Sequence, residues 1–232
     1  ALARLTQITS AAGEGDYANR LLVMIGLASM GVAGALLLGQ RDLKRMLAYS
    51  SVEQMGILAL ATGLGAGATF ATLLHLVNNA LGKGALFLAV GNVHRAFGGK
   101  TTGEVRGALR RLPVSGTIFL LSFFAVTGSP PFGLFVSEML ILKSVFAAHR
   151  WLVGGLFLAG LFVVFAGMGA TSLAALQGRP PASARASSYR DGFATAAPAL
   201  LLLGLVLLFG LHLPAGIRDL IADAAAALEV GR

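Results

Sequence analysis

Long apolar stretches alternate with short polar segments along the chain, and this pattern predicts six membrane-spanning helices. A stretch of roughly 20 predominantly apolar residues is enough to cross the hydrocarbon core of a bilayer. The predicted spans cover residues 20–40, a segment after the turn at 41–42 that ends near 65, and residues 69–93, 115–146, 151–177 and 193–213. We therefore expect an all-α, polytopic transmembrane helix bundle.

The fourth stretch, residues 115–146, is interrupted near its middle by Gly128, Pro130, Pro131 and Gly133. Proline cannot continue a helix because it lacks the amide hydrogen and clashes with the preceding turn. Backbone groups freed in this way are tolerated at membrane depth only inside protein or beside a water-filled cavity. Glu138 follows the break, and an acid beside a discontinuous helix is typical of an ion site in a transporter.

The flanking segments divide the chain into three parts. Residues 1–19 are expected to form the end of a preceding helix and a polar loop, and the chain opens without Met, so we expect a longer protein. Residues 20–177 form a five-span unit, and residues 178–232 hold a loop, the last span and a short interfacial helix. Apolar residues at helical spacing predict that last helix: Ile217, Leu220, Ile221, Ala224 and Leu228.

Composition places the protein in a membrane and excludes several classes of site. Apolar residues make up 56% of the chain, charged residues 12%, and the mean hydropathy is +0.79. The net charge of +8 does not indicate nucleic-acid binding, because the basic residues lie in short loops and form no folded basic face. Without Cys there is no thiolate metal site or iron–sulfur cluster, and we expect no cofactor in this chain.

The loops differ in basic residues, which predicts the orientation. One side carries eleven, namely Arg41, Lys44, Arg45, Arg95, Lys100, Arg106, Arg110, Arg111, Arg179, Arg185 and Arg190. The other side carries six, namely Arg4, Arg20, Lys143, Arg150, Arg218 and Arg232. Because basic loops stay in the cytoplasm, we expect a cell inner (plasma) membrane protein with both chain ends outside.

The third span carries a polar stripe. His75, Asn79 and Lys83 stand at i, i+4 and i+8 and therefore share one helical face. A lysine and a histidine in a membrane helix can gain and lose a proton, which favours a proton relay. A packing stripe that only hydrogen-bonds a neighbouring helix would have the same spacing.

Three further charges lie within predicted spans, and each has a simpler alternative. Glu138 could pair with a cation only to be tolerated in lipid. Lys44 could reach the cytoplasmic surface as a snorkelling charge. Glu53 is deeper, and Gln54 with nearby serines could satisfy it without any transport.

Three blocks carry a resemblance to a known family. RDLKRMLAYSSVEQMG at residues 41–56, HLVNNALGKGALFLAVGNV at 75–93 and TGSPPFGLFVSEMLIL at 127–142 resemble the antiporter-like subunits of respiratory complex I, Mrp cation/proton antiporters and membrane-bound hydrogenases. The SSVEQMG block is most similar to hydrogenase-4 and formate hydrogenlyase type membrane subunits.

The resemblance implies two inverted repeats of five helices, of which this chain matches the second plus a trailing helix. It also implies that Lys44, Lys83 and Glu138 match buried charges of the family. The family often has His where this chain has Gln54 and Asn79. Neither amide can be titrated, although both can orient water.

The resemblance implies a proton-translocating membrane subunit of a redox-driven oxidoreductase complex of NADH-quinone or hydrogenase type. The expected proton pathway comprises Lys44, Glu53, His75, Lys83 and Glu138, with Gln54 and Asn79 orienting water. Its partners are other membrane subunits, including antiporter-like neighbours, and redox cofactors in partner subunits. Two alternatives stay open: a subunit of a Na⁺/H⁺ antiporter assembly, and a structural subunit that transports nothing.

Overall fold

The structure, a computed structural model, describes residues 2–182 and 188–229. Within these ranges it is all-α, as the sequence predicts, with no strand. Its elements are α1 (Leu2–Ala11), α2 (Gly15–Leu37), α3 (Leu43–Gly63), η1 (Ala66–Ala68), α4 (Thr69–Phe97), α5 (Ala108–Arg111), α6 (Pro113–Val126), α7 (Gly133–Ala147), α8 (Trp151–Leu176), α10 (Phe193–Leu211) and α11 (Ala215–Glu229). Arg185 and Arg232, which entered the count of basic residues, lie outside the described ranges.

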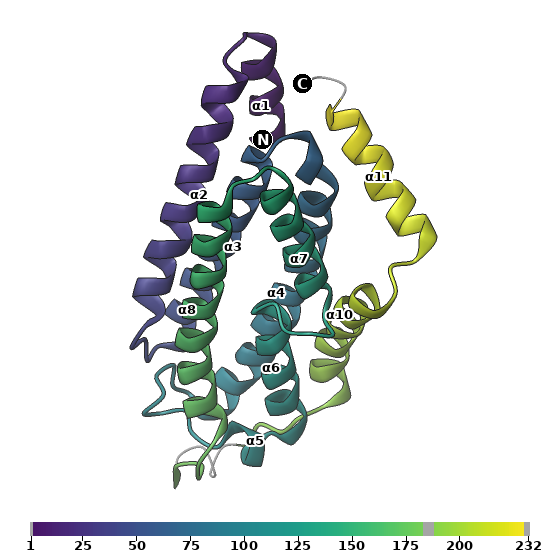
Figure 1. The fold of residues 1–232 in the computed structure, drawn as a ribbon. Helices are drawn as coiled ribbons and strands as arrows, with labels where there is room; N and C mark the ends of the chain where they lie inside the picture. Colours follow the sequence, from purple (N-terminus) through teal and green to yellow (C-terminus); the bar gives the residue numbers. More distant parts are fainter. Residues whose placement is uncertain (1, 183–187, 230–232) are drawn as a thin grey trace.

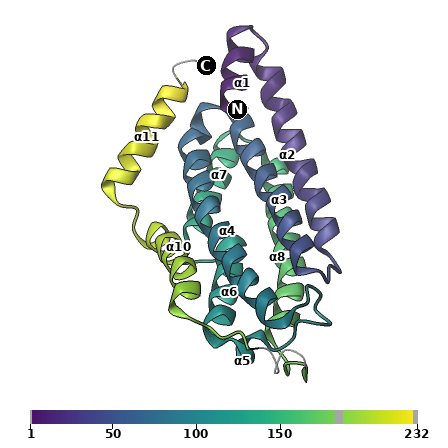
Figure 2. The same ribbon diagram turned by 180° about the vertical axis from the view of Figure 1, so that it is seen from behind.

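The helices form an elongated bundle (Figure 1). Helices α2 and α8 lie on one side, α4 and α6 lie in the middle, and α10 and α11 lie on the other side, as the reverse view also shows (Figure 2). Helix α1 and the end of α11 share one end of the bundle, and α5 lies at the opposite end. The middle position of α4 places its polar stripe inside the bundle.

Each of the six expected spans corresponds to a helix or, for the fourth, to the pair α6 and α7. Within the described residues, four helical segments are long and apolar enough to cross a membrane, namely Gly15–Leu37, Ala66–Phe97, Trp151–Leu176 and Phe193–Leu211. The other two are the more polar α3 and the broken helix. The expected transmembrane bundle with one discontinuous helix is therefore confirmed.

Helices α2 and α3 approach each other closely at two glycines. A Cβ atom on Gly26 would lie 2.6 Å from the Gly56 carbonyl oxygen, and one on Gly56 would lie 2.8 Å from the Gly26 carbonyl oxygen. Small residues let helix backbones come together in this way in membranes. The close approach fixes α3 against α2.

Helix α6 is capped by a residue far along the chain. The Asp191 carboxylate accepts hydrogen bonds from the amides of Val114 at 3.0 Å and Ser115 at 3.3 Å, and from the Ser115 hydroxyl at 2.5 Å. Nearby, the Tyr189 hydroxyl donates to Asn92 Oδ1 of α4 at 3.0 Å. These contacts tie the segment before α10 to α4 and α6.

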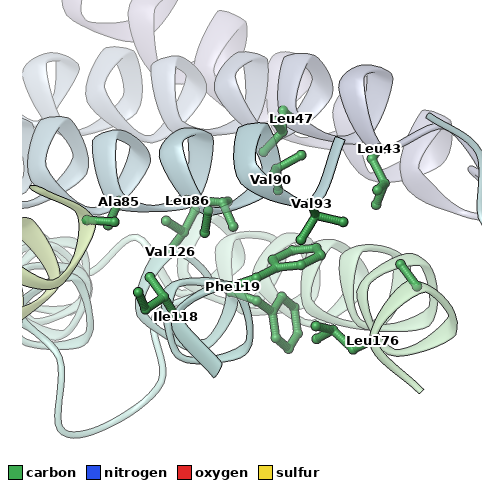
Figure 3. Close-up of a cluster of buried hydrophobic side chains, with 14 of the residues drawn as sticks. Leu43, Leu47, Ala85, Leu86, Val90, Val93, Ile118, Phe119, Val126 and Leu176 are labelled. Atoms are coloured by element: carbon green, nitrogen blue, oxygen red, sulfur yellow. The ribbon is translucent and has the colours of Figure 1, made fainter. Parts of the chain in front are cut away.

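An apolar cluster packs between α3, α4, α6 and α8 (Figure 3). Leu86, Val90 and Val93 of α4 pack there with Ile118 and Phe119 of α6, and all five are buried. Leu86, Val90 and Val93 follow Lys83 along α4, so the polar stripe gives way to apolar packing in this direction.

The expected last helix is present as α11. Ile221 and Ala225 are buried, and Gln7 Nε2 of α1 donates to the Leu228 carbonyl at 3.0 Å. Helix α11 also contacts α4. Its location at the membrane surface stays a prediction.

Candidate functional site

The break between α6 and α7 is built around two side chains. Gly128 has a φ of +65°, and a Cβ atom there would overlap the Glu138 carboxylate. Gly133 begins α7 with its backbone against the Asn78 amide, and Asn78 Nδ2 donates to the Gly133 carbonyl at 3.1 Å. The glycines of the break therefore allow a buried acid and a buried amide to reach the backbone directly.

A chain of hydrogen bonds crosses the bundle beside this break. Gln54 Nε2 donates to the Val126 carbonyl at the end of α6 at 3.2 Å. Gln54 Oε1 lies 2.9 Å from His75 Nε2, and His75 Nδ1 lies 2.9 Å from the Ser137 hydroxyl of α7. The imidazole of α4 thus connects α3 to α7, and Gln54 reaches α6, so both halves of the broken helix are joined.

The orientation of Gln54 determines the tautomer of His75. Because the amide nitrogen of Gln54 donates to the Val126 carbonyl, its oxygen faces His75 and accepts a hydrogen bond from a protonated Nε2. The Ser137 hydroxyl can then donate to Nδ1 or to the Leu134 carbonyl, which is 2.9 Å away. One rotation of the Ser137 hydroxyl therefore supplies or removes the hydrogen bond to His75 Nδ1.

A buried lysine and a buried acid lie next to this chain, namely Lys83 on α4 and Glu53 on α3. The Lys83 ammonium donates to the Ser50 hydroxyl, which donates in turn to the Leu47 carbonyl at 2.9 Å. Lys83 also attracts Glu53 electrostatically, and both side chains are buried. The acid therefore has its opposite charge on the neighbouring helix.

Six buried polar atoms in the described residues have no hydrogen-bond partner, and all six are oxygens. They are Glu53 Oε2, Thr69 Oγ1, Asn78 Oδ1, Asn79 Oδ1, Ser122 Oγ and Glu138 Oε1. An unpaired buried polar group costs about 1–3 kcal/mol. Four of these atoms, the two carboxylate oxygens and the two amide oxygens, can only accept hydrogen bonds.

The structure brings together most of the predicted site residues. Glu53, Gln54, His75, Lys83 and Glu138 are buried in the bundle, and Asn79 is buried with its carbonyl oxygen unpaired. The predicted helix break at Gly128, Pro130, Pro131 and Gly133 separates α6 from α7.

Lys44 does not join this group. It is exposed in the first turn of α3, where it lines a pocket of about 270 Å³ with His94 and Lys100. Asp42 caps this turn by accepting from the Lys44 amide at 2.8 Å. This position fits the snorkelling alternative rather than a buried charge.

Sequence reasoning missed two polar contributors, namely Asn78 and Ser137, whereas Ser50 was one of the serines expected near Glu53. Asn78 could have been found from helical spacing, because it is three residues after His75 and therefore shares its face. Ser137 could have been found from its position next to Glu138. Among the described residues, no group of three His, Asp or Glu side chains could hold a metal ion.

At the end away from the basic loops, a pocket of about 450 Å³ opens beside α7. Lys143, Ser144, Gly67 and Phe70 are among its lining residues, and the Ser144 hydroxyl donates to the Gly67 carbonyl at 2.9 Å. Ser144 is thus a second hydrogen-bonding hydroxyl of α7, two turns beyond Ser137 and beside this pocket.

Comparisons with known proteins relate the chain to a family of membrane subunits. Residues 1–164 match the family described as "NADH:quinone oxidoreductase/Mrp antiporter, TM". A "Hydrogenase-4 component F homolog" of Methylacidiphilum infernorum is 38% identical over 148 residues, which are 63% of this chain and 31% of the relative. A "Na(+)/H(+) antiporter subunit A1" of Staphylococcus aureus is 31% identical over 163 residues, 64% of this chain and 20% of the relative. The chain therefore spans a third or less of these relatives.

Solved structures share the fold. A chain of the membrane-bound sulfane sulfur reductase, described as an archaeal respiratory membrane complex, superposes with a TM-score of 0.86 at 25% identity, covering 98% of this chain and 46% of that chain. A chain of the Mrp complex of Dietzia sp. DQ12-45-1b gives 0.81 at 22% identity, with 92% and 48% covered. A chain of respiratory complex I from Thermus thermophilus gives 0.79 at 24% identity, with 94% and 46% covered.

Proposed function

The chain belongs to the NADH:quinone oxidoreductase/Mrp antiporter transmembrane family, and from this premise we propose that it is part of a proton-translocating subunit of a redox-driven membrane complex. The observation that carries the proposal is the hydrogen-bonded chain of Gln54, His75 and Ser137 across the broken helix. It has a buried acid next to each end, because Glu53 precedes Gln54 and Glu138 follows Ser137.

In the proposed pathway, a proton first reaches the buried pair formed by Lys83 of α4 and Glu53 of α3. The proton passes the imidazole of His75, whose two nitrogens are both hydrogen-bonded, and reaches Glu138 at the break. Gln54 and Asn79 have no titratable group, so they orient water along this route. A change of charge at one member alters the affinity of the others for protons.

The exit is proposed to lie at the pocket beside Lys143 and Ser144. Glu138 and Ser144 lie on the same helix, and Ser144 is hydrogen-bonded across to Gly67. The buried apolar cluster that includes Leu86, Val90 and Phe119 disfavours release in the opposite direction, because it offers a proton no hydrogen-bonding group. With the basic loops cytoplasmic, this direction of release is outward across a plasma membrane.

The partners are proposed to be other membrane subunits, with the redox cofactors in subunits other than this one. Similarity to a hydrogenase-4 component F homologue and to a chain of a respiratory sulfur-reducing complex supports this assembly. A second candidate is a subunit of a Na⁺/H⁺ antiporter assembly, which the similarity to an antiporter subunit A1 supports.

Proton movement by the intact complex in sealed vesicles tests the proposal. Lys83→Met and Glu138→Gln should each lower the protons moved per electron at equal complex yield and equal redox rate. Arg179→Gln, at an exposed position after α8, serves as the matched control. Normal pumping by both variants would contradict the proposed pathway and would favour a structural subunit that transports nothing. Sodium-dependent proton exchange without a redox substrate would favour the antiporter assembly.

A further inference from the structure

The buried charges of the described residues do not balance. Four ionisable side chains are buried, namely Glu53, His75, Lys83 and Glu138, with exposed fractions between 0% and 9%. With both acids ionised, Lys83 charged and His75 neutral, this interior would hold one surplus negative charge. An uncompensated buried charge is strongly destabilising, so a further positive charge must be bound.

The hydrogen bonds of His75 do not require that charge. A neutral imidazole with its proton on Nε2 donates to Gln54 Oε1 and accepts from the Ser137 hydroxyl at Nδ1. Both contacts are therefore satisfied without a second proton on the ring. The surplus charge has to be balanced at the acids.

The two acids, by contrast, each have an unsatisfied oxygen. Glu53 Oε2 and Glu138 Oε1 are buried without a partner, as are the carbonyl oxygens of Asn78 and Asn79. These oxygens accept hydrogen bonds, and an ionised carboxylate cannot donate one. A neutral carboxylic acid supplies one donor and removes one negative charge at the same time.

We propose that Glu53 and Glu138 share a single exchangeable proton, so that one of the two carboxyl groups is neutral while Lys83 is charged. Both acids adjoin the same hydrogen-bonded chain, since Glu53 precedes Gln54 and Glu138 follows Ser137, and like charges in a shared buried site do not both ionise. When Glu138 releases its proton at the break, Glu53 becomes the neutral member by taking up the next one. This inference deepens the proposed function and rests on it for the direction of proton flow.

The charge count gives a test by infrared difference spectroscopy of the assembled complex. A buried neutral carboxyl group has a C=O stretch that is separate from carboxylate bands and shifts in D₂O. Native protein should show one such group from this pair. Glu53→Gln and Glu138→Gln should each abolish it, because the remaining acid is then neutralised by Lys83. Lys83→Met should add a second neutral carboxyl group.

A control variant and the two glutamine variants distinguish the possible outcomes. Glu14→Gln removes an exposed carboxylate between α1 and α2 and should leave the band unchanged. A band that persists in either glutamine variant would overturn the sharing, because one acid would then be neutral regardless of the other. If Lys83→Met does not assemble, the two glutamine variants decide alone. The spectra read charge state and not transport, so a normal charge count without pumping would overturn only the proposed function.

Discussion

The carboxylate of Glu138 lies directly against Gly128, the residue at which the chain leaves α6. The two are ten residues apart on opposite sides of the break, and no side chain separates them. The position of the Glu138 carboxylate therefore depends on the absence of a side chain at Gly128.

Gly128→Ala is expected to destabilise the protein by at least about 1 kcal/mol, since a positive φ is costly for any residue with a Cβ atom. The added methyl group would also displace the Glu138 carboxylate. Thermal unfolding in lipid nanodiscs measures the effect. Gly31→Ala, in an open helical position of α2, should leave stability unchanged or slightly raised. Equal melting temperatures for both variants would contradict the packing described here.

Gln54→Leu is expected to lower stability by about 2 kcal/mol, because it leaves the Val126 carbonyl and His75 Nε2 without their partner. Met55→Leu changes the exposed neighbouring residue and should have little effect. Urea unfolding of the two variants, followed by circular dichroism, compares them. An unaffected Gln54→Leu would show that the hydrogen-bonded chain does not stabilise the bundle.

Asp191→Ala is expected to cost about 1 kcal/mol, the usual loss for a helix cap, without changing protons moved per electron. Its distance from the buried acids makes it a test of structure alone. Thermal unfolding and vesicle pumping together measure both effects, with Asp223→Ala in exposed α11 as the control. A loss of pumping at normal stability would place Asp191 in the pathway instead.

The loop after α4 is expected to loosen in acid. Hydrogen bonds from the Thr101 hydroxyl and from the amides of Thr101 and Lys100 lower the pKa of the exposed Glu104 carboxyl below its usual value of 4.5. A lowered pKa in the folded state means that the stabilisation is complete above the unfolded value and is lost as the pH falls through the folded one. Hydrogen exchange of the Lys100 and Thr101 amides should therefore gain an acid-dependent opening as the pH falls below 4.5.

Glu104→Gln provides the comparison for this loop. Its amide cannot ionise, so exchange at Lys100 and Thr101 should be faster than in the native protein near neutral pH, with no added transition in acid. An acid transition of the same size in both proteins would assign the effect to another group.

Much of the candidate site could be predicted from the sequence because it depends on local rules. Two prolines and two glycines fix the break in any fold, and the i, i+4 spacing of His75 and Asn79 puts them on one face of α4. Glu138 follows the break within two helical turns, so its position near the break could also be predicted.

Other features depend on how helices rotate and pack, which spacing alone does not determine. Asn78 and Asn79 are neighbours in sequence, yet it is Asn78 that faces Gly133, because α4 presents that side to α7. Lys44 matched a buried family position, but the cap at Asp42 starts α3 immediately before it and leaves it at the surface. The choice between burial and snorkelling required the packed structure.

The cap on α6 has a consequence for the order in which the protein is made. The capping residue, Asp191, follows the capped amide of Val114 by 77 residues. It lies beyond α8 and beyond residue 164, where the family match ends. A ribosome that has finished α6, α7 and α8 has not yet supplied this carboxylate. The first amides of α6 therefore lack this hydrogen-bond acceptor during insertion. They gain it only when the segment that carries Asp191 is synthesised and packs against α6.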